Sequence, residues 1–151
     1  MGRETYIIMK RRFESEINQL PIRAAFNKHQ FNEMLESWGI DQTKDDFRKC
    51  VVALGYGTFI QKKDYSEFKE LLERQEQELS WAFDSDITGE GFIKEAFEYE
   101  LANHEWIING DIEPALNELG LSYEKLNNDC RYITGLKLAK EDIRQWHKEN
   151  G

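Results

Sequence analysis

The stretch from Asp84 to Glu105 reads DSDITGEGFIKEAFEYELANHE, and it decides how the chain is organised. An acidic loop with two glycines leads into a segment where apolar residues return every three or four positions, as on one face of a helix. A second apolar stripe precedes the loop, so we expect two helices that pack as a hairpin. The expected seam joins Phe92, Phe97 and Leu101 with Leu71, Leu72 and Leu79.

The rest of the chain repeats the helical pattern. Apolar stripes with helical spacing run through residues 4–20, 27–38, 64–83, 111–119, 123–127 and 129–148. Around Gly55 and Gly57 the β-branched and aromatic residues are instead typical of strands joined by a tight turn. Two short pieces, residues 21–26 and 106–108, are also predicted to be extended. The predicted fold class is mainly α (α+β), a compact single-domain helical fold with a small β-hairpin near residues 50–61.

Length and composition limit the classes of protein to which the chain can belong. The chain has 151 residues, 40% hydrophobic and 32% charged, which suits one globular domain over residues 1–151. No apolar run approaches the roughly 20 residues of a membrane span, and no signal peptide is apparent. Cys50 and Cys130 form no CxxC pair, which argues against a disulfide framework and a structural zinc site. We expect a cytoplasmic protein.

Charge is concentrated in the middle of the chain. The net charge is -9, and residues 64–129 alone carry 18 acidic against 4 basic side chains. This block disfavours direct nucleic-acid binding through the acidic centre and favours a basic partner or cations. It is equally typical of a solvated surface on an acidic protein. The candidate partner-binding residues are Glu67, Glu70, Glu73, Glu76, Glu78, Asp84, Asp86 and Glu90.

The acidic loop also has the spacing of a calcium-binding EF-hand. Asp84, Asp86, Thr88 and Glu95 fall at positions 1, 3, 5 and 12, and Gly89 falls at the turn position 6. Position 8, normally aliphatic, is a glycine, and no second loop of this kind is present. The alternative is an ordinary turn rich in Asp and Gly that caps the following helix. The sequence therefore predicts no cofactor while leaving Ca²⁺ open.

A polar cluster ends the helix that follows the loop. It consists of Glu100, Asn103, His104 and Glu105. The HExxH and GxSxG motifs that would support metal or serine hydrolase chemistry are absent, so we assign no catalytic residue and expect no enzyme. Asn103 and His104 are predicted to cap the end of the helix, with an acid–base pair of Glu100 and His104 as the alternative.

Three segments carry a resemblance to a known family. They are AFNKHQFNEMLESWGI, GYGTFIQKKD and TGEGFIKEAFEYELANHEWIINGDIEPALNELGLS. Together they resemble small acidic proteins of unknown function carried by phages, plasmids and conjugative elements of Firmicutes and Bacteroidetes. The resemblance covers roughly residues 13–140 and implies a setting in which antagonists of host defence, such as anti-CRISPR and anti-restriction proteins, are common. It implies no catalytic residues.

These observations lead to one functional expectation and one alternative. We expect a non-catalytic inhibitor in the cytoplasm of the bacterial host, whose acidic centre occupies the basic nucleic-acid groove of a CRISPR effector or restriction nuclease. Its carboxylates could imitate phosphates. The alternative is a calcium-binding helix–loop–helix module. We expect no membrane among the partners, and a homo-oligomer stays open.

Overall fold

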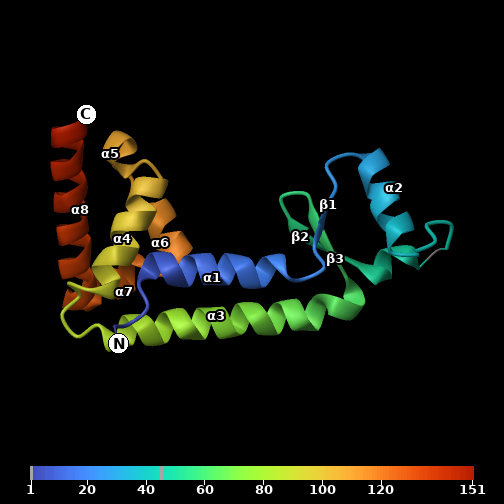
Figure 1. The fold of residues 1–151 in the computed structure, drawn as a ribbon, viewed down its shortest axis with the longest axis horizontal. Helices are drawn as coiled ribbons and strands as arrows, with labels where there is room; N and C mark the ends of the chain where they lie inside the picture. Colours follow the sequence, from blue (N-terminus) through green and yellow to red (C-terminus); the bar gives the residue numbers. More distant parts are fainter. Residues whose placement is uncertain (1, 45) are drawn as a thin grey trace. The chain divides into compact units, whose positions relative to one another are not determined.

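The chain is mainly helical, with a small three-stranded antiparallel sheet (Figure 1). The computed structural model describes residues 2–44 and 46–151. It divides into two compact units, which we call the helical unit (Met1–Arg11 and Glu78–Gly151) and the sheet unit (Arg12–Gln77). The boundary falls inside α1 (Tyr6–Asn18) and inside α3 (Tyr65–Ser85). No helix in the described part of the chain is long and apolar enough to cross a membrane.

The sheet unit confirms the predicted β-hairpin and the short edge strand. Its elements are β1 (Arg23–Ala24), α2 (Lys28–Ser37), η1 (Phe47–Cys50), β2 (Val51–Gly55), β3 (Thr58–Gln61) and η2 (Lys62–Asp64). The strand order is β1-β3-β2, so β3 is central. The turn of the hairpin places Tyr56 and Gly57 at positive φ, the backbone geometry of a tight two-residue connection.

Helix α2 closes one side of the sheet-unit core. Asn27 begins it, because the Asn27 side chain accepts a hydrogen bond from the Gln30 amide at 2.8 Å. The Gln30 side chain accepts in return from the Phe26 amide at 2.8 Å, a reciprocal arrangement similar to a capping box. The helix then buries Met34 and Leu35 beside Ala25.

The helical unit is built around α4 (Phe92–Asn103). Its other helices are α5 (Trp106–Asn109), α6 (Glu113–Leu119), α7 (Tyr123–Asn128) and α8 (Cys130–Asn150). Helix α4 packs on α8 and α6, so the predicted hairpin seam with α3 is wrong. The ring of Phe83, near the end of α3, has its centroid 5.6 Å from that of the Phe92 ring and 5.7 Å from that of the Tyr132 ring. Phe97 and Leu101 are buried as predicted.

The predicted extended piece at residues 106–108 is also wrong. Trp106–Asn109 forms one turn of helix, held between Glu105 and Gly110 in the left-handed region. The Asn109 side chain donates to the carbonyl of His104 at 3.1 Å, which satisfies the backbone locally. Trp106 is buried while Ile108 is 80% exposed, so the helical turn buries the larger ring.

Candidate functional site: the acidic loop, the acidic helix and a buried glutamate

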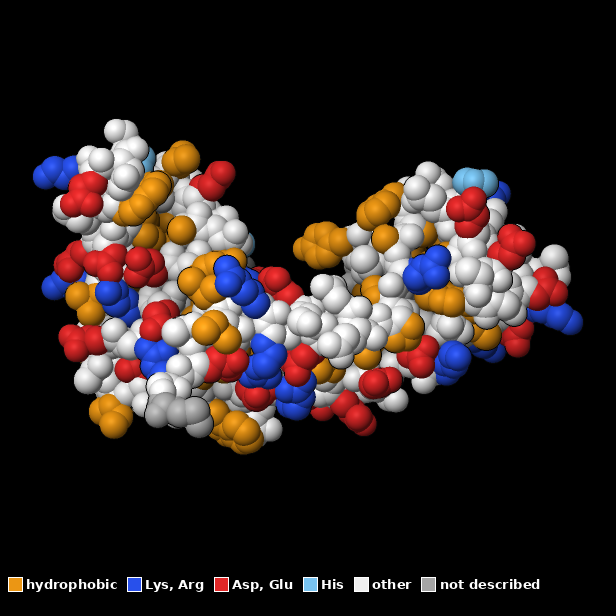
Figure 2. Space-filling view, viewed as in Figure 1, with side chains coloured by type: hydrophobic (Ala, Val, Ile, Leu, Met, Phe, Trp, Pro, Cys, Tyr) orange, Lys and Arg blue, Asp and Glu red, His pale blue; other side chains and the backbone are white. Residues whose placement is uncertain are grey.

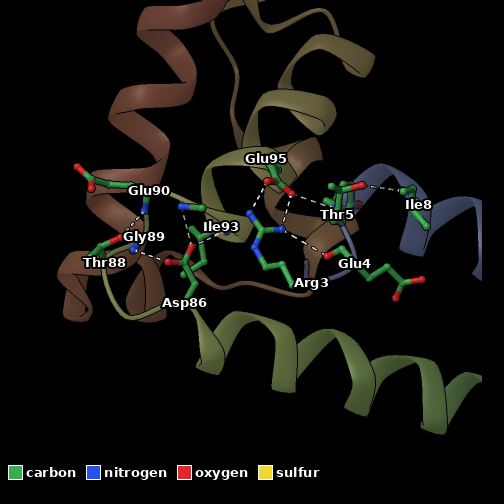
Figure 3. Close-up of polar contacts among 12 residues, drawn as sticks. Arg3, Glu4, Thr5, Ile8, Asp86, Thr88, Gly89, Glu90, Ile93 and Glu95 are labelled. Atoms are coloured by element: carbon green, nitrogen blue, oxygen red, sulfur yellow. Dashed lines mark hydrogen bonds and ion pairs between the residues drawn. The ribbon is translucent and has the colours of Figure 1, made fainter. Parts of the chain in front are cut away.

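Asp86 organises the acidic loop by accepting backbone hydrogen bonds (Figure 3). One carboxylate oxygen, Oδ1, accepts from the Gly89 amide at 3.0 Å. The other, Oδ2, accepts from the amides of Gly91 at 3.2 Å and Ile93 at 2.9 Å. Burial alone would raise the pKa of Asp86, but these hydrogen bonds outweigh it and hold that pKa below its ordinary value. Asp86 is therefore the cap of α4, as the turn interpretation of the loop predicts.

The loop is held against α8 from the other side. The Arg131 guanidinium donates to the carbonyl oxygens of Phe83 at 2.9 Å and Asp86 at 3.0 Å. Asp129 orients that guanidinium through a 2.8 Å ion pair. Gly89 lies so close to α8 that a Cβ placed on it would be 2.0 Å from the Arg131 carbonyl oxygen. No other residue type fits at Gly89 without moving the loop.

The fourth predicted calcium ligand has other partners. Arg3 donates to both carboxylate oxygens of Glu95, at 3.0 Å and 2.5 Å (Figure 3). The Tyr6 amide donates to Glu95 at 3.1 Å. The hydrogen bond from Arg3 holds the pKa of Glu95 below its ordinary value.

The predicted calcium site is therefore not assembled. The carboxylate of Asp86 accepts hydrogen bonds from backbone amides, and that of Glu95 accepts from Arg3. The Thr88 hydroxyl accepts a hydrogen bond from the Glu90 amide at 3.1 Å. Asp84 contributes a carbonyl oxygen to Arg131, at 3.4 Å, rather than a carboxylate to the loop. Across residues 2–44 and 46–151, no group of three or more His, Cys, Asp and Glu side chains is placed to hold a metal ion.

The acidic residues of α3 within the sheet unit lie at the surface. Glu67, Glu70, Glu73 and Glu76 are all exposed. Among the described residues, none of the four has an ion-pair partner. Acidic side chains, with basic ones among them, gather along α3 in Figure 2. We call these four glutamates the acidic helix surface.

The remaining predicted partner-binding residues differ from that surface. Asp84 and Glu90 are exposed, but they belong to the helical unit. Glu78 is half-buried and has an interaction partner, and the oxygens of Asp86 are engaged in the cap. Six of the eight predicted residues are therefore exposed, four of them on α3 in the sheet unit, whereas Asp86 is engaged in the cap.

Glu100 is the most unusual acidic residue, since its side chain has no exposed surface. Its Oε2 atom accepts hydrogen bonds from the Tyr6 hydroxyl and from Lys10 Nζ, both on α1. Lys10 also donates to Glu118 on α6 at 3.3 Å, and its ammonium lies 5.0 Å from the centre of the Tyr99 ring. A buried carboxylate is tolerated when it is paired and hydrogen-bonded, and α1 supplies both.

The other side of Glu100 faces His104. The Glu100 Oε1 and His104 Nε2 atoms are 3.8 Å apart, and both are buried without a hydrogen-bond partner in the described structure. Asn103 and Glu105, predicted to share this cluster, are exposed and do not join it. His104 ends α4 through its backbone, while its side chain turns toward Glu100 instead of capping the helix.

Tyr6 and Lys10, the two hydrogen-bond donors to Glu100, both have a raised pKa. Burial, followed by the hydrogen bond and charge of Glu100, raises the pKa of Tyr6 far above its ordinary value, so the hydroxyl stays a donor. Burial lowers the pKa of Lys10, but the hydrogen bond and charge of Glu100 outweigh it and raise that pKa. The arrangement is a neutralised polar contact inside the helical unit.

Three cations that bind the acidic loop, Glu95 and Glu100 were not predicted from the sequence. Lys10, Arg3 and Arg131 were not among the predicted site residues. A signal for Lys10 exists, because it follows Tyr6 by four residues and so shares the inward stripe of α1. Arg3 and Arg131 reach partners 92 and 48 positions away, which local spacing does not reveal.

The fold and the site define a class: a mainly helical protein with an acidic exposed helix and a loop whose backbone amides are capped by Asp86. Comparison with known families shows to which family the chain belongs. A family model matches residues 5–142, and the chain belongs to that family, described as a family of unknown function (DUF7659). The match includes residues of both units. No curated protein and no solved structure matches the chain.

Proposed function

We propose that this protein is a non-catalytic interaction protein that docks the acidic helix surface onto a basic surface of another protein. The observation that carries the proposal is the set of exposed glutamates on α3 without ion-pair partners among the described residues. Unpaired surface carboxylates keep their negative potential available to a partner. The resemblance to proteins of mobile genetic elements supports a host defence nuclease as that partner, with the protein acting as its inhibitor.

The helix geometry refines how such docking would work. Residues of an α-helix advance by about 100° each, so successive steps of three turn by about 300°. Glu67, Glu70, Glu73 and Glu76 are spaced by three residues and therefore wind around the helix instead of forming a straight row. This distribution favours a broad negative surface that fits a concave basic groove. It supports electrostatic attraction more than atom-by-atom imitation of a phosphate backbone.

A binding and cleavage assay tests the proposal. The protein is titrated against CRISPR effector and restriction nucleases at about 50 mM and 300 mM salt, and DNA cleavage is measured alongside binding. We expect inhibition at the lower salt concentration that weakens at the higher one, because salt screens exposed charges. Glu67→Lys, Glu70→Lys and Glu73→Lys together should abolish it.

A matched control separates the acidic helix surface from total charge. Glu36→Lys, Glu141→Lys and Glu149→Lys change the net charge by the same amount at exposed positions elsewhere. This control should retain most of the inhibition. Absence of binding to every nuclease at low salt contradicts the nuclease partner, and equal loss in both triple variants contradicts the assigned surface.

A further inference from the structure

The sheet unit contains an apolar pocket of about 480 Å³ that the proposed function does not use. It lies between one face of the sheet and the parts of α1 and α3 that belong to this unit. Its main apolar lining comes from Ile17, Leu20, Ile22, Leu54, Phe68 and Leu72. Pockets of about 300–1,000 Å³ with such linings are the usual size for small-molecule sites. Hydrophobic side chains also reach the surface around the sheet in Figure 2.

One cation stands at this pocket. Arg23 on β1 is the charged side chain among the lining residues, and it is exposed. Among the described residues it has no ion-pair partner, although the chain carries 29 acidic side chains. Thr58 is a polar neighbour, but its hydroxyl already donates to the Gly55 carbonyl at 2.7 Å. The guanidinium therefore remains available to bind an anionic group at the pocket.

Tyr56 gives the second, independent observation. Tyr56 is among the lining residues of the pocket, it is 99% exposed, and its φ is 54°. A tight hairpin turn of this kind favours Asn, Asp or Gly at that position, and a bulky residue there is strained. Backbone strain of this kind recurs at ligand clamps and binding sites. An exposed aromatic ring beside an apolar pocket offers a face that a ligand in the pocket can cover.

From these features we propose that the pocket binds an aliphatic carboxylate, with the hydrocarbon chain against Leu54, Phe68 and Leu72. The carboxylate pairs with Arg23, whose planar guanidinium matches carboxylate geometry. The Tyr56 ring covers the chain at the mouth. This inference concerns a different surface from the acidic helix surface and does not depend on the proposed function.

Calorimetry with simple ligands below their micelle concentrations tests the site. Decanoate is the probe, with hexanoate and 1-decanol as comparisons. We expect decanoate to bind, and each methylene removed to weaken binding about fourfold. The alcohol, which lacks the charge, should bind at least about tenfold more weakly. Equal binding of decanoate and 1-decanol would overturn the role of the cation.

Two variants and one control locate the site. Arg23→Gln should remove the preference for decanoate over 1-decanol, while Arg48→Gln, an exposed cation outside the pocket lining, should keep it. Leu54→Trp should fill the pocket and abolish binding of both ligands while the circular dichroism spectrum stays helical. If Leu54→Trp does not fold, Arg23→Gln decides alone. Unchanged decanoate preference in Arg23→Gln shows that the pocket is not the site.

Discussion

Lys10 of α1 donates a hydrogen bond to Glu100 of α4, whose side chain has no exposed surface. The two residues are 90 positions apart, so this contact ties the start of the chain to the centre of the helical unit. Removing one member of a buried ion pair leaves the other charge without compensation, which costs far more than the pair itself contributes. Glu100 thus makes the helical unit dependent on α1.

Lys10→Met should lower the free energy of unfolding by about 3 kcal/mol, because it leaves the Glu100 carboxylate buried without its cation. Urea unfolding followed by circular dichroism measures the change. Lys137→Met is the control, since Lys137 is exposed and has no ion-pair partner among the described residues. The control should stay within about 0.5 kcal/mol of the unmodified protein. A similar loss in both variants would mean that the buried pair is not the cause.

The stability gap between Lys10→Met and the unmodified protein should also depend on pH. The pKa of Lys10 is raised in the folded state, so its contribution is fully present below the unfolded value of about 10.4. It disappears as pH rises through the folded pKa. Urea unfolding at pH 7, 9 and 11 should therefore give a constant gap at the first two values and a smaller one at the third. A gap that narrows toward pH 7 would contradict the pairing.

Gly89→Ala should destabilise the helical unit by about 2–5 kcal/mol, through overpacking and a left-handed backbone. The new Cβ would lie 2.0 Å from the Arg131 carbonyl oxygen, and the φ of Gly89 is 84°. Gly110→Ala is matched for the backbone, because its φ is 70° but nothing lies within 4 Å of the added atom. That control should cost only about 1 kcal/mol. The difference between the two melting temperatures isolates the close approach to α8.

Asp86→Ala should cost about 1–3 kcal/mol, because it removes the acceptor of the Gly89, Gly91 and Ile93 amides. The pKa of Asp86 is lowered in the folded protein, so its contribution is present above the unfolded value of about 3.9. That contribution is lost as pH falls through the folded pKa. Chemical unfolding should therefore give a constant gap from pH 5 to 8 and a shrinking gap below pH 4. A gap that persists unchanged at low pH would contradict an ionised cap.

Calcium at about 1 mM should leave the melting temperature unchanged, since Asp86 and Glu95 are already bound to backbone amides and Arg3. Even weak EF-hand sites bind calcium at about 10⁻⁴–10⁻³ M, so this concentration is sufficient to detect one. Differential scanning calorimetry with and without EDTA makes the comparison. A calcium-dependent rise that Glu95→Gln removes would restore the metal-binding interpretation of the loop.

Phe97→Ala should cost about 3–5 kcal/mol because Phe97 is 1% exposed in the core of the helical unit. Leu72→Ala should cost less, since Leu72 is 39% exposed in the sheet unit. Glu70→Lys with Glu73→Lys should leave stability almost unchanged, because both residues are exposed. Thermal unfolding of the three variants gives the order. Unfolding of the charge-reversal variant would show that these glutamates stabilise the fold.

Local signals in the sequence predicted the elements well. The turn at Gly57 depends on only a few residues, so the signal for it is complete in a short stretch of sequence. A short apolar run does not distinguish a strand from a helical turn. Trp106 and its neighbours have strand-forming side chains, but the left-handed residues at each end direct them into a helical turn.

Contacts between distant elements were not predictable in the same way. An apolar stripe shows that α4 has a buried face, but it does not say which helix covers that face. The short loop between α3 and α4 suggested a hairpin, yet the Arg131 contacts and the missing Cβ of Gly89 let α8 approach instead. The acidic loop likewise has the residue spacing of a calcium loop, and the contacts of Glu95 with Arg3 and of Asp86 with backbone amides could not be predicted from that spacing.

The division of the chain into a discontinuous helical unit and a continuous sheet unit sets an order for synthesis. Translation proceeds at about 5–20 residues per second, so Lys10 is added to the chain roughly 5–20 s before Glu100. During that interval every residue of the sheet unit has already been added. The whole sheet unit is therefore synthesised before Glu100, the residue that Tyr6 and Lys10 contact in the helical unit.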